Sequence, residues 1–575
     1  MLKKVLLIVI IIVYSCEKSS NSIIADIVIT NARVYTLSWD DPSLDGIPAQ
    51  NAPYENGVWQ PDAEAIAIKD RLIQFVGTND EIQNYIGENT KIIDANNALV
   101  VPGLIESHGH VQEIGEKEEA VNLLNLSAKD IIDVIYKRSL EIPEGEWIVG
   151  SGWDEAVFAN DYPDMLELSA KVPNHPVVLN GLRGFGAMGN QLAFEKAGIT
   201  NKTEATDGGE ILKDDNGNLI YVLLNQAKNL LNNKVPEKSF EQKSRMMMYG
   251  LDELKSLGFT TAHHAGVIGK HMEVYEDLQS KDQLPIRIQA FVAARMFNID
   301  LVNKWLEKGP TTNDTSFLQV KTFKAYYDGS LGSRGANFIE DYSDMPGQKG
   351  VSSTDYGFHP DLIKKAMDAG FQLAIHAIGD KGNRDVLDFY ENYFKENPQS
   401  KALRHRIEHA QIVHPDDFKR FGELNIVASV EPGHAVEDMP WAIDRVGEER
   451  AKGGYAWRTL RKNNVTVIFN ADYTGTDPSF FYGAYCAITK QKKDDDKQWF
   501  PEQTFTPEET LRAYTIWAAY ASKQEHLTGT IEKGKWADLT FMDMDVLNVG
   551  NTNPNQLLNG QILKTMVNGK VVYEK

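Results

Sequence analysis

Short apolar runs alternate with helical stretches through most of the chain. This alternation is typical of βα units, in which helices cover a sheet of parallel strands. Eight runs fit the strand pattern, and eight strands close a (β/α)₈ barrel. The runs are ALVVPGLIES, GFTTAHH, PIRIQAFVA, FLQVKTFKAYY, GFQLAIHAI, LRHRIEHAQ, NIVASVEP and VTVIFNADY. We therefore expect an α/β fold with a TIM barrel at its centre.

Both ends of the chain have the character of β-structure without intervening helices. Residues 24–100 contain short alternating strands between Asn, Asp and Gly turns, and residues 526–575 resemble them. Asn568 and Gly569 form the sequence of a type I′ hairpin turn. We expect a small β-sandwich built from both ends, although two separate β modules fit the strands equally well. The barrel would then occupy residues 101–525, with an insertion at about 111–257 that contains a further strand, HPVVLN.

The first sixteen residues have the layout of a secretory signal. Lys3 and Lys4 precede an apolar run over residues 5–13, which is too short to span a bilayer, and Cys16 follows. This resembles a bacterial lipoprotein signal, in which the cysteine carries the lipid and becomes the new N-terminus. We expect lipidation at Cys16 and a location at the cell envelope, periplasmic or surface-exposed, with the lipid as the only membrane attachment. An ordinary signal peptide cleaved nearby is the alternative.

The balance of charge narrows the range of partners. Asp and Glu number 81 against 59 Lys and Arg, which gives a net charge of −22. Such a chain repels the phosphates of nucleic acids, so we expect no nucleic-acid partner, although the charge by itself does not identify a small-molecule substrate. Cys16 and Cys486 are the two cysteines of the sequence. With Cys16 lipidated, no disulfide can form within the chain, and Cys486 is expected to be a buried, inert thiol.

Residues of metal-binding types end several of the apolar runs. The carboxyl ends of barrel strands all face one mouth, so side chains at these positions are expected to converge. In chain order they are His108, His110, Lys324, His376, His409 and Asp472. Imidazole and carboxylate groups suit Zn²⁺ and similar divalent ions. A single buried histidine is more often a hydrogen-bonded core residue than a ligand, so the joint pattern carries the prediction of a metal site.

At these residues the chain resembles the amidohydrolase superfamily, and within it amidohydrolase family 3, the branch that includes N-substituted formamide deformylase. The resemblance runs nearly end to end. Its motifs, in the family's order, are PGLIESHGH, GGEILKDDNG, FKAYYDGSLGSR, HAIGDKGN, RIEHAQ and NADYTGTDP. The closing GTIEKGKWADLTFMD is similar to the family's return strand into its β-sandwich, which favours a single sandwich.

The resemblance implies a metal-dependent hydrolase with one or two divalent ions, of which zinc is the expected one. The implied ligands are His108, His110, Lys324, His376, His409 and Asp472. Lys324 would be carboxylated to a carbamate able to bridge two metals; an unmodified lysine beside one metal, or an oxyanion partner, is the alternative. Asp472 would also carry the proton in the hydrolysis of a C–N bond of an amide, formamide or cyclic amide by metal-activated water.

A different class of function also fits the resemblance: a non-catalytic lipoprotein that uses the barrel as a binding module. Retention of all six ligand positions argues against it, because a binding module has no need of Asp472.

Two segments depart from the family's pattern. In LRGFGAMGNQLAF, Arg183 and Phe185 stand where the family has Asp and His. We expect Phe185 to face the substrate and to alter substrate preference, with neutral change on a loop as the alternative. Glu431 in SVEPGH stands where relatives usually carry Gln, and with His434 it is expected to contact the substrate.

Overall fold

The computed structural model describes residues 24–124, 126–153, 162–181, 186–205, 209–332, 334–473 and 475–575. The expected signal segment with Cys16, and also Arg183 and Phe185, lie outside these ranges. In the described part of the chain, none of the helices combines the length and the apolar character needed to cross a membrane.

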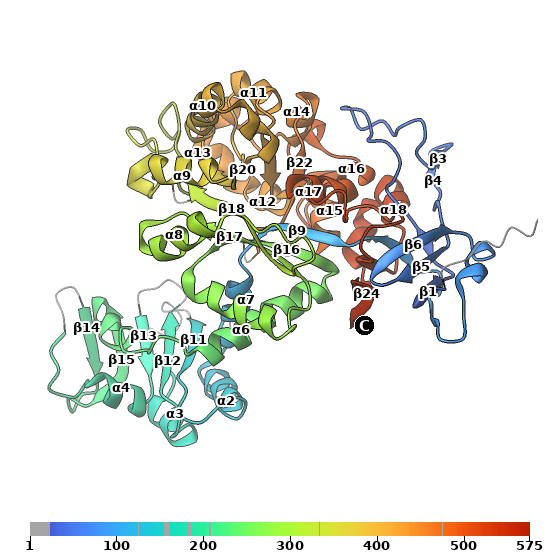
Figure 1. The fold of residues 1–575 in the computed structure, drawn as a ribbon. Coiled ribbons are helices and arrows are strands. Elements are labelled where there is room, and N and C mark those ends of the chain that lie inside the picture. Colours follow the sequence, from blue (N-terminus) through green and yellow to red (C-terminus); the bar gives the residue numbers. More distant parts are fainter. Residues whose placement is uncertain are drawn as a thin grey trace, which may run out of the picture.

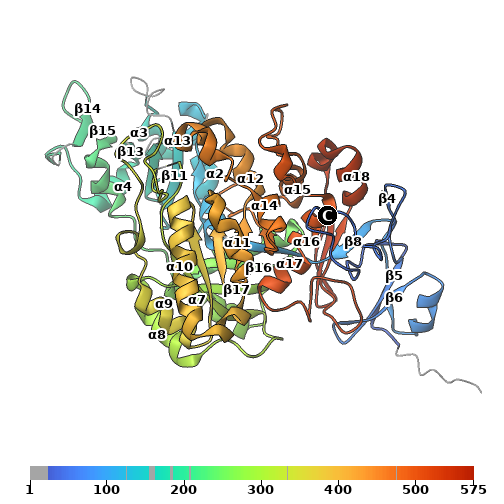
Figure 2. The ribbon, with the colours of Figure 1, turned by 90° about the horizontal axis from the view of Figure 1, so that it is seen from above.

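Eight parallel strands form the central barrel, which confirms the predicted fold class (Figures 1 and 2). In neighbour order they are β9 (Leu104–Gly109), β16 (Phe259–Val267), β17 (Arg287–Ala293), β18 (Leu318–Tyr326), β19 (Gln372–Ala377), β20 (Arg406–His409), β21 (Val427–Val430) and β22 (Val467–Phe469). The two end strands of this sheet, β22 and β9, approach each other where Gly109 forms a parallel bridge with Tyr473. Because all eight strands run parallel, their carboxyl ends meet at one mouth.

Helices surround this barrel on its outer face (Figure 2). They are α6 (Phe240–Ser256), α7 (Gly269–Ser280), α8 (Ile299–Lys308), α9 (Pro360–Asp368), α10 (Asp380–Glu396), α11 (Phe418–Glu423), α14 (Trp457–Lys462), α16 (Pro507–Ala513) and α17 (Ile516–Ala521). Strands buried on both sides read as continuous apolar runs, which is why these segments were recognisable in the sequence.

The first predicted barrel strand is in fact two strands, which corrects the sequence reading. Residues Leu99–Pro102 form β8, which belongs to a different sheet, and the barrel begins with β9 after Gly103. Gly103 packs so closely on Thr260 that an added Cβ would lie 2.2 Å from its hydroxyl oxygen. A side chain at this position would collide with Thr260 where the chain passes from one sheet into the other.

The two ends of the chain meet in one sheet beside the barrel. Its five strands, in order, are β2 (Arg33–Val34), β8, β23 (Leu539–Met542), β24 (Ile562–Val567) and β25 (Lys570–Glu574). A second sheet comprises β6 (Leu72–Gly77), β5 (Ala65–Lys69), β1 (Ile27–Thr30) and β7 (Lys91–Asp94). One apolar cluster contains side chains of both sheets, including Ile66 and Phe541. Asn568 and Gly569 both have positive φ, as the predicted type I′ turn requires.

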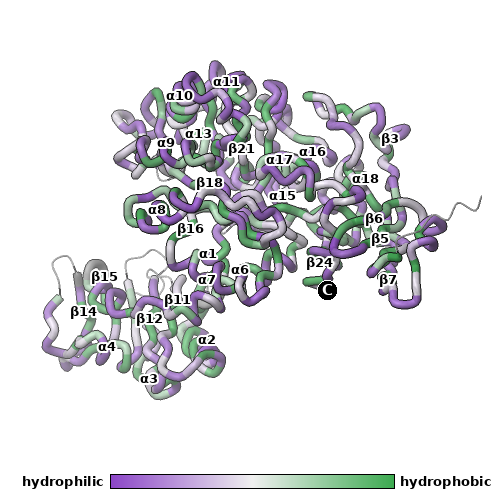
Figure 3. Tube along the Cα trace, in the orientation of Figure 1, coloured by the Kyte–Doolittle hydropathy of each residue, from purple (hydrophilic) through white to green (hydrophobic). Residues whose placement is uncertain are grey.

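Residues between α1 (Val111–Glu119) and α6 form a separate unit on the side of the barrel opposite the two terminal sheets (Figure 1). Its sheet has the order β10 (Val121–Asn122), β11 (Ile148–Trp153), β12 (Val177–Gly181), β13 (Gly186–Gly189), β15 (Leu219–Asn225) and β14 (Gly209–Lys213). The run HPVVLN supplies β12. Helices α2 (Ala128–Ser139), α3 (Met165–Lys171), α4 (Gln191–Ala197) and α5 (Asn229–Asn232) accompany the sheet. Hydrophobic stretches run through this unit, the barrel and the terminal sheets alike (Figure 3), because each has its own apolar cluster.

Helices α1 and α6 cross at very short range beside the barrel mouth. An added Cβ on Gly115 would lie 2.0 Å from the carbonyl oxygen of Met246, and one on Gly250 would lie 2.1 Å from that of Val111. Only glycine permits such an approach of two backbones. Since α1 begins directly after His110, this crossing fixes the chain that carries the His-x-His pair.

Candidate metal centre at the barrel mouth

The six predicted ligands line one cavity of about 420 Å³ at the carboxyl ends of the strands. His108 lies on β9 with His110 directly after it, Lys324 on β18, His376 on β19 and His409 at the end of β20. Asp472 follows β22 by three residues. The cavity's lining also includes Gln411, His434 and Asp438 on the polar side. The structure therefore brings together every one of the six residues, as barrel topology leads one to expect.

The first group of donor atoms comes from β9 and the segment after β22. Asp472 Oδ1 lies 3.2 Å from His110 Nε2 and 3.6 Å from His108 Nε2. These three side chains present one ligand atom each, all within 4.8 Å of one another. Although burial alone would raise it, the pKa of Asp472 lies well below its usual range, because His110, His108 and His409 surround the carboxylate. The Asp472 carboxylate is therefore ionised, the form that can bind a cation.

The second group consists of histidines on neighbouring strands. The rings of His376 and His409 have centroids 4.4 Å apart, and the ring of His108 lies 5.2 Å from that of His409. His376 Nε2 lies 3.6 Å from Asp328 Oδ1 and is buried without a hydrogen-bond partner among the described residues, so this nitrogen is available to a metal ion. Burial lowers the pKa of His376 well below its usual range and that of His108 to about 4. Both imidazoles are therefore neutral, the form that binds metal.

Lys324 joins the two groups. Its Nζ lies 3.0 Å from His108 Nε2, and the side chain is 1% exposed. Burial lowers the pKa of Lys324 to about 8, which increases the share of the uncharged, nucleophilic amine near neutral pH. An ammonium among metal ligands is unfavourable, whereas a neutral or carboxylated lysine suits this position.

A buried hydrogen-bond network inside the barrel holds the ring of His108 in place, and the sequence analysis did not predict it. Glu408 Oε2 lies 2.5 Å from His108 Nδ1, and Arg406 donates to both oxygens of Glu408 at 2.7 and 2.9 Å. Arg406 and Glu408 are 0% exposed. The signal was present in RIEHAQ, because residues at i and i+2 of a strand share a face and an Arg-x-Glu pair in a buried strand indicates an interior ion pair.

Of the two residues expected to contact the substrate near the end of β21, His434 lies in the cavity wall and Glu431 does not. The Glu431 carboxylate is 3% exposed and lies behind the cavity, with Oε2 3.1 Å from His409 Nδ1 and 3.7 Å from His434 Nδ1. Against the effect of burial, Glu431 raises the pKa of His434 to about 9. His434 thus offers a protonated ring to whatever enters the cavity.

The backbone is strained where the ligands project. His409 and Ala410 have φ of 72° and 40°, and Asp472 has φ of 44°. Non-glycine residues rarely adopt such angles, and those that do are concentrated at functional sites. Two of these residues, His409 at the end of β20 and Asp472 after β22, line the cavity at the barrel mouth.

Aromatic side chains form the remaining wall of the cavity. Tyr326, Tyr356 and Trp441 line it together with Leu331 and Ile378. The rings of Tyr326 and Tyr356 lie 5.8 and 6.5 Å from that of His376. The guanidinium of Arg295 stacks on Tyr326 at 4.3 Å and holds that ring in place.

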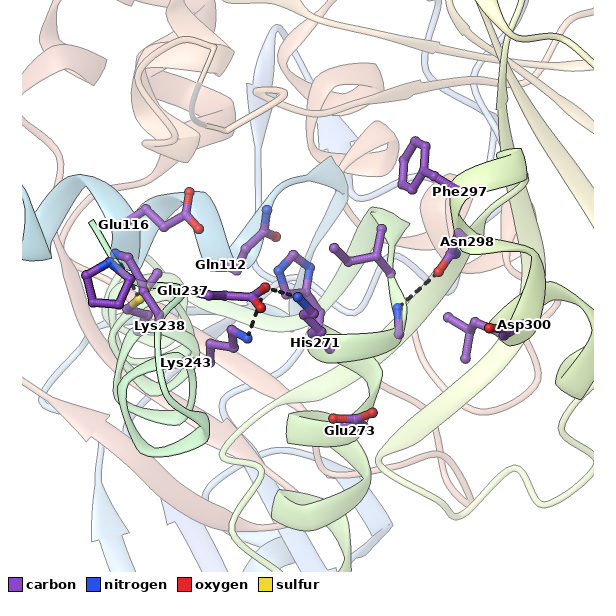
Figure 4. Close-up of a pocket in the computed structure, with 16 residues that line it drawn as sticks. Gln112, Glu116, Glu237, Lys238, Lys243, His271, Glu273, Phe297, Asn298 and Asp300 are labelled. Carbon is purple, nitrogen blue, oxygen red and sulfur yellow. Dashed lines mark hydrogen bonds and ion pairs between the residues drawn. The ribbon is translucent and has the colours of Figure 1, made fainter. Parts of the chain in front are cut away.

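A second cavity of about 660 Å³ lies between α1, α6, α7 and the start of α8 (Figure 4). Three of its charged side chains pair with one another: Glu237 contacts Lys243 at 3.8 Å and also Lys270. The side chains at the barrel mouth instead converge on one volume with their ligand atoms directed to it. The barrel mouth is therefore the candidate functional site.

A parallel barrel whose histidines, lysine and aspartate meet at the carboxyl mouth has the architecture and donor groups of a metal-dependent hydrolase. The chain belongs to the amidohydrolase family, whose model matches residues 91–573.

Known proteins resemble this chain over most of its length. Protein LONG AFTER FAR-RED 3 of Arabidopsis thaliana is 30% identical over 563 residues, covering 96% of this chain and 92% of the relative. N-substituted formamide deformylase of Arthrobacter pascens is 25% identical over 536 residues, covering 89% and 95%. The crystal structure of an uncharacterized metal-dependent hydrolase from Pyrococcus furiosus has the same fold, with a TM-score of 0.70, 23% identity and coverage of 91% and 99%.

Proposed function

We propose that this protein hydrolyses the C–N bond of a small amide, formamide or cyclic amide with the help of one or two divalent metal ions, zinc foremost. One observation carries the proposal: the ligand atoms of His108, His110 and Asp472 lie within 4.8 Å of one another, with Lys324, His376 and His409 around the same cavity. Two or more neutral imidazoles and a carboxylate are the donor set that zinc prefers.

The residues present fit the metal. The Asp472 carboxylate is ionised and the imidazoles of His108 and His376 are uncharged, so these three side chains need no deprotonation before ligation. A bound divalent ion would supply two effects, polarisation of the substrate's carbonyl oxygen and a lower pKa of an attacking water, from about 15.7 towards 7.

The protein's own part in the reaction is proton transfer by Asp472. Its carboxylate takes one proton from the attacking water while the new C–O bond forms at the carbonyl carbon. It then gives that proton to the leaving nitrogen as the C–N bond breaks, so that a carboxylic acid and an amine result. His434, with its protonated ring at the cavity wall, is placed to stabilise negative charge on the substrate's oxygen.

We propose further that Lys324 is carboxylated. The lone pair of Nζ attacks CO₂, a C–N bond forms, and the amine loses a proton to solvent, which gives a carbamate with two ligand oxygens. The buried position beside His108 and the lowered pKa support this. The test is a carbonyl signal in ¹³C NMR of protein equilibrated with ¹³C-bicarbonate; the proposal requires that signal in the wild type and its loss in Lys324→Arg.

The cell-envelope location, with lipid on Cys16, is likewise proposed on the sequence of the N-terminal segment. Metabolic labelling with a palmitate analogue, compared between the wild type and Cys16→Ala, tests it.

The hydrolase proposal is tested on a panel of N-acyl, N-formyl and cyclic amides, with the amine product quantified. We expect turnover of at least one class, and a decrease in kcat of about 10²–10⁴-fold in Asp472→Asn. Asp416→Asn, an exposed carboxylate 82% accessible, serves as the control and should leave kcat unchanged. Turnover that survives in Asp472→Asn would refute the assigned role of Asp472.

A further inference from the structure

Glu431 lies at the point where β21 ends and α12 (Pro432–Glu437) begins. Its Oε2 contacts Nδ1 of His409 at 3.1 Å and faces Nδ1 of His434 at 3.7 Å. One buried carboxylate oxygen therefore stands between a metal ligand and a histidine of the cavity wall. Glu431 itself does not line the cavity.

This contact determines which nitrogen each ring can offer. A carboxylate only accepts hydrogen bonds, so in each of the two rings the Nδ1 that faces Glu431 carries a proton. The Nε2 lone pair of His409 is then free for a metal ion. Carboxylates that accept from the second nitrogen of a ligand histidine fix its tautomer and orientation and raise its basicity.

The same arrangement occurs a second time in this barrel. His108 Nδ1 faces Glu408 at 2.5 Å, as His409 Nδ1 faces Glu431. The two carboxylates differ in what else holds them. Arg406 binds both oxygens of Glu408, whereas Glu431 Oε1 is buried without a hydrogen-bond partner among the described residues. Its contacts with His409 and His434 are therefore the interactions by which Glu431 can act on the site.

We propose that Glu431 is a positioning residue that orients the metal ligand His409 and the cavity residue His434 at the same time, so that metal affinity and substrate binding depend on one carboxylate. The inference rests on the proposed metal site, since it takes His409 as a ligand. It assigns Glu431 no contact with the substrate.

The experiment measures metal affinity by competition with a chelator in the wild type, Glu431→Gln and Glu431→Leu. Loss of a carboxylate behind a ligand histidine typically weakens metal binding about 10–100-fold. We expect metal binding to weaken about tenfold in Glu431→Gln, which keeps an acceptor oxygen, and about 100-fold in Glu431→Leu. His434→Gln should keep wild-type metal affinity and raise KM, and Glu431→Gln should raise KM as well.

The control is Glu437→Gln, six residues further along, whose carboxylate accepts from Thr476 and Tyr482 and contacts no histidine. It should leave metal affinity unchanged. The visible spectrum of the Co²⁺-loaded protein separates positioning from ligation, because a positioning role leaves the ligand set and the band shape of Glu431→Gln as in the wild type.

Two results would overturn the inference. Wild-type metal affinity in Glu431→Leu would show that Glu431 positions nothing. If Glu431→Gln bound one equivalent of Co²⁺ less than the wild type at saturation and had an altered visible spectrum, Glu431 would itself be a ligand. Failure of the proposed function is a separate result, because it would appear as a wild type that binds no metal.

Discussion

Removal of the Glu408 carboxylate should destabilise the barrel far more than loss of an exposed carboxylate. Glu408 is 0% exposed and receives Arg406 Nε at 2.7 Å and Nη2 at 2.9 Å. Glu408→Gln keeps the shape but leaves the Arg406 charge buried without its counter-ion. Breaking a buried ion pair in this way typically costs about 3–5 kcal/mol.

The assay is urea unfolding of the metal-free protein, followed by circular dichroism. The control is Glu276→Gln, which removes a carboxylate paired with Lys304 at 2.7 Å on the surface, where the Glu276 and Lys304 side chains are 36% and 48% exposed. That change should cost about 0–1 kcal/mol. The double variant Arg406→Met/Glu408→Leu should recover most of the loss, because no unpaired charge remains. A Glu408→Gln protein within about 1 kcal/mol of the wild type would refute the reasoning.

Three further predictions follow from the fold and the cavity. Gly115→Ala, whose Cβ would lie 2.0 Å from the Met246 carbonyl oxygen, should lower the free energy of unfolding by about 1–3 kcal/mol in the same urea assay, whereas Gly269→Ala, with open space around it, should not. Trp441→Ala should raise KM about tenfold for amides with a large apolar substituent and leave it unchanged for small ones, measured across a substituent series; an equal effect on both would exclude Trp441 from the binding wall. Chelation should lower the free energy of unfolding by about 2.7 kcal/mol relative to protein with free metal at 100 times Kd, measured by calorimetry; equal stability with and without chelator would contradict a metal bound by the folded state.

The barrel and the converging ligands could be predicted from the sequence because both depend on local pattern. His376 and His409 end apolar runs, and parallel strands bring such ends to one mouth. The break at Gly103 was missed because it depends on pairing between β8 and β23, which lie far apart in the chain. Sequence reasoning placed Glu431 at the substrate because it cannot tell a cavity wall from the layer behind it.

The most direct test of the account is the metal content of purified protein, by mass spectrometry of the element, for the wild type and His376→Ala. We predict about one or two equivalents of a divalent metal in the wild type and a clear loss in the variant, with amide hydrolysis lost in parallel. A wild-type protein that stays metal-free and inactive after incubation with zinc and bicarbonate would contradict the central claim and favour a binding module.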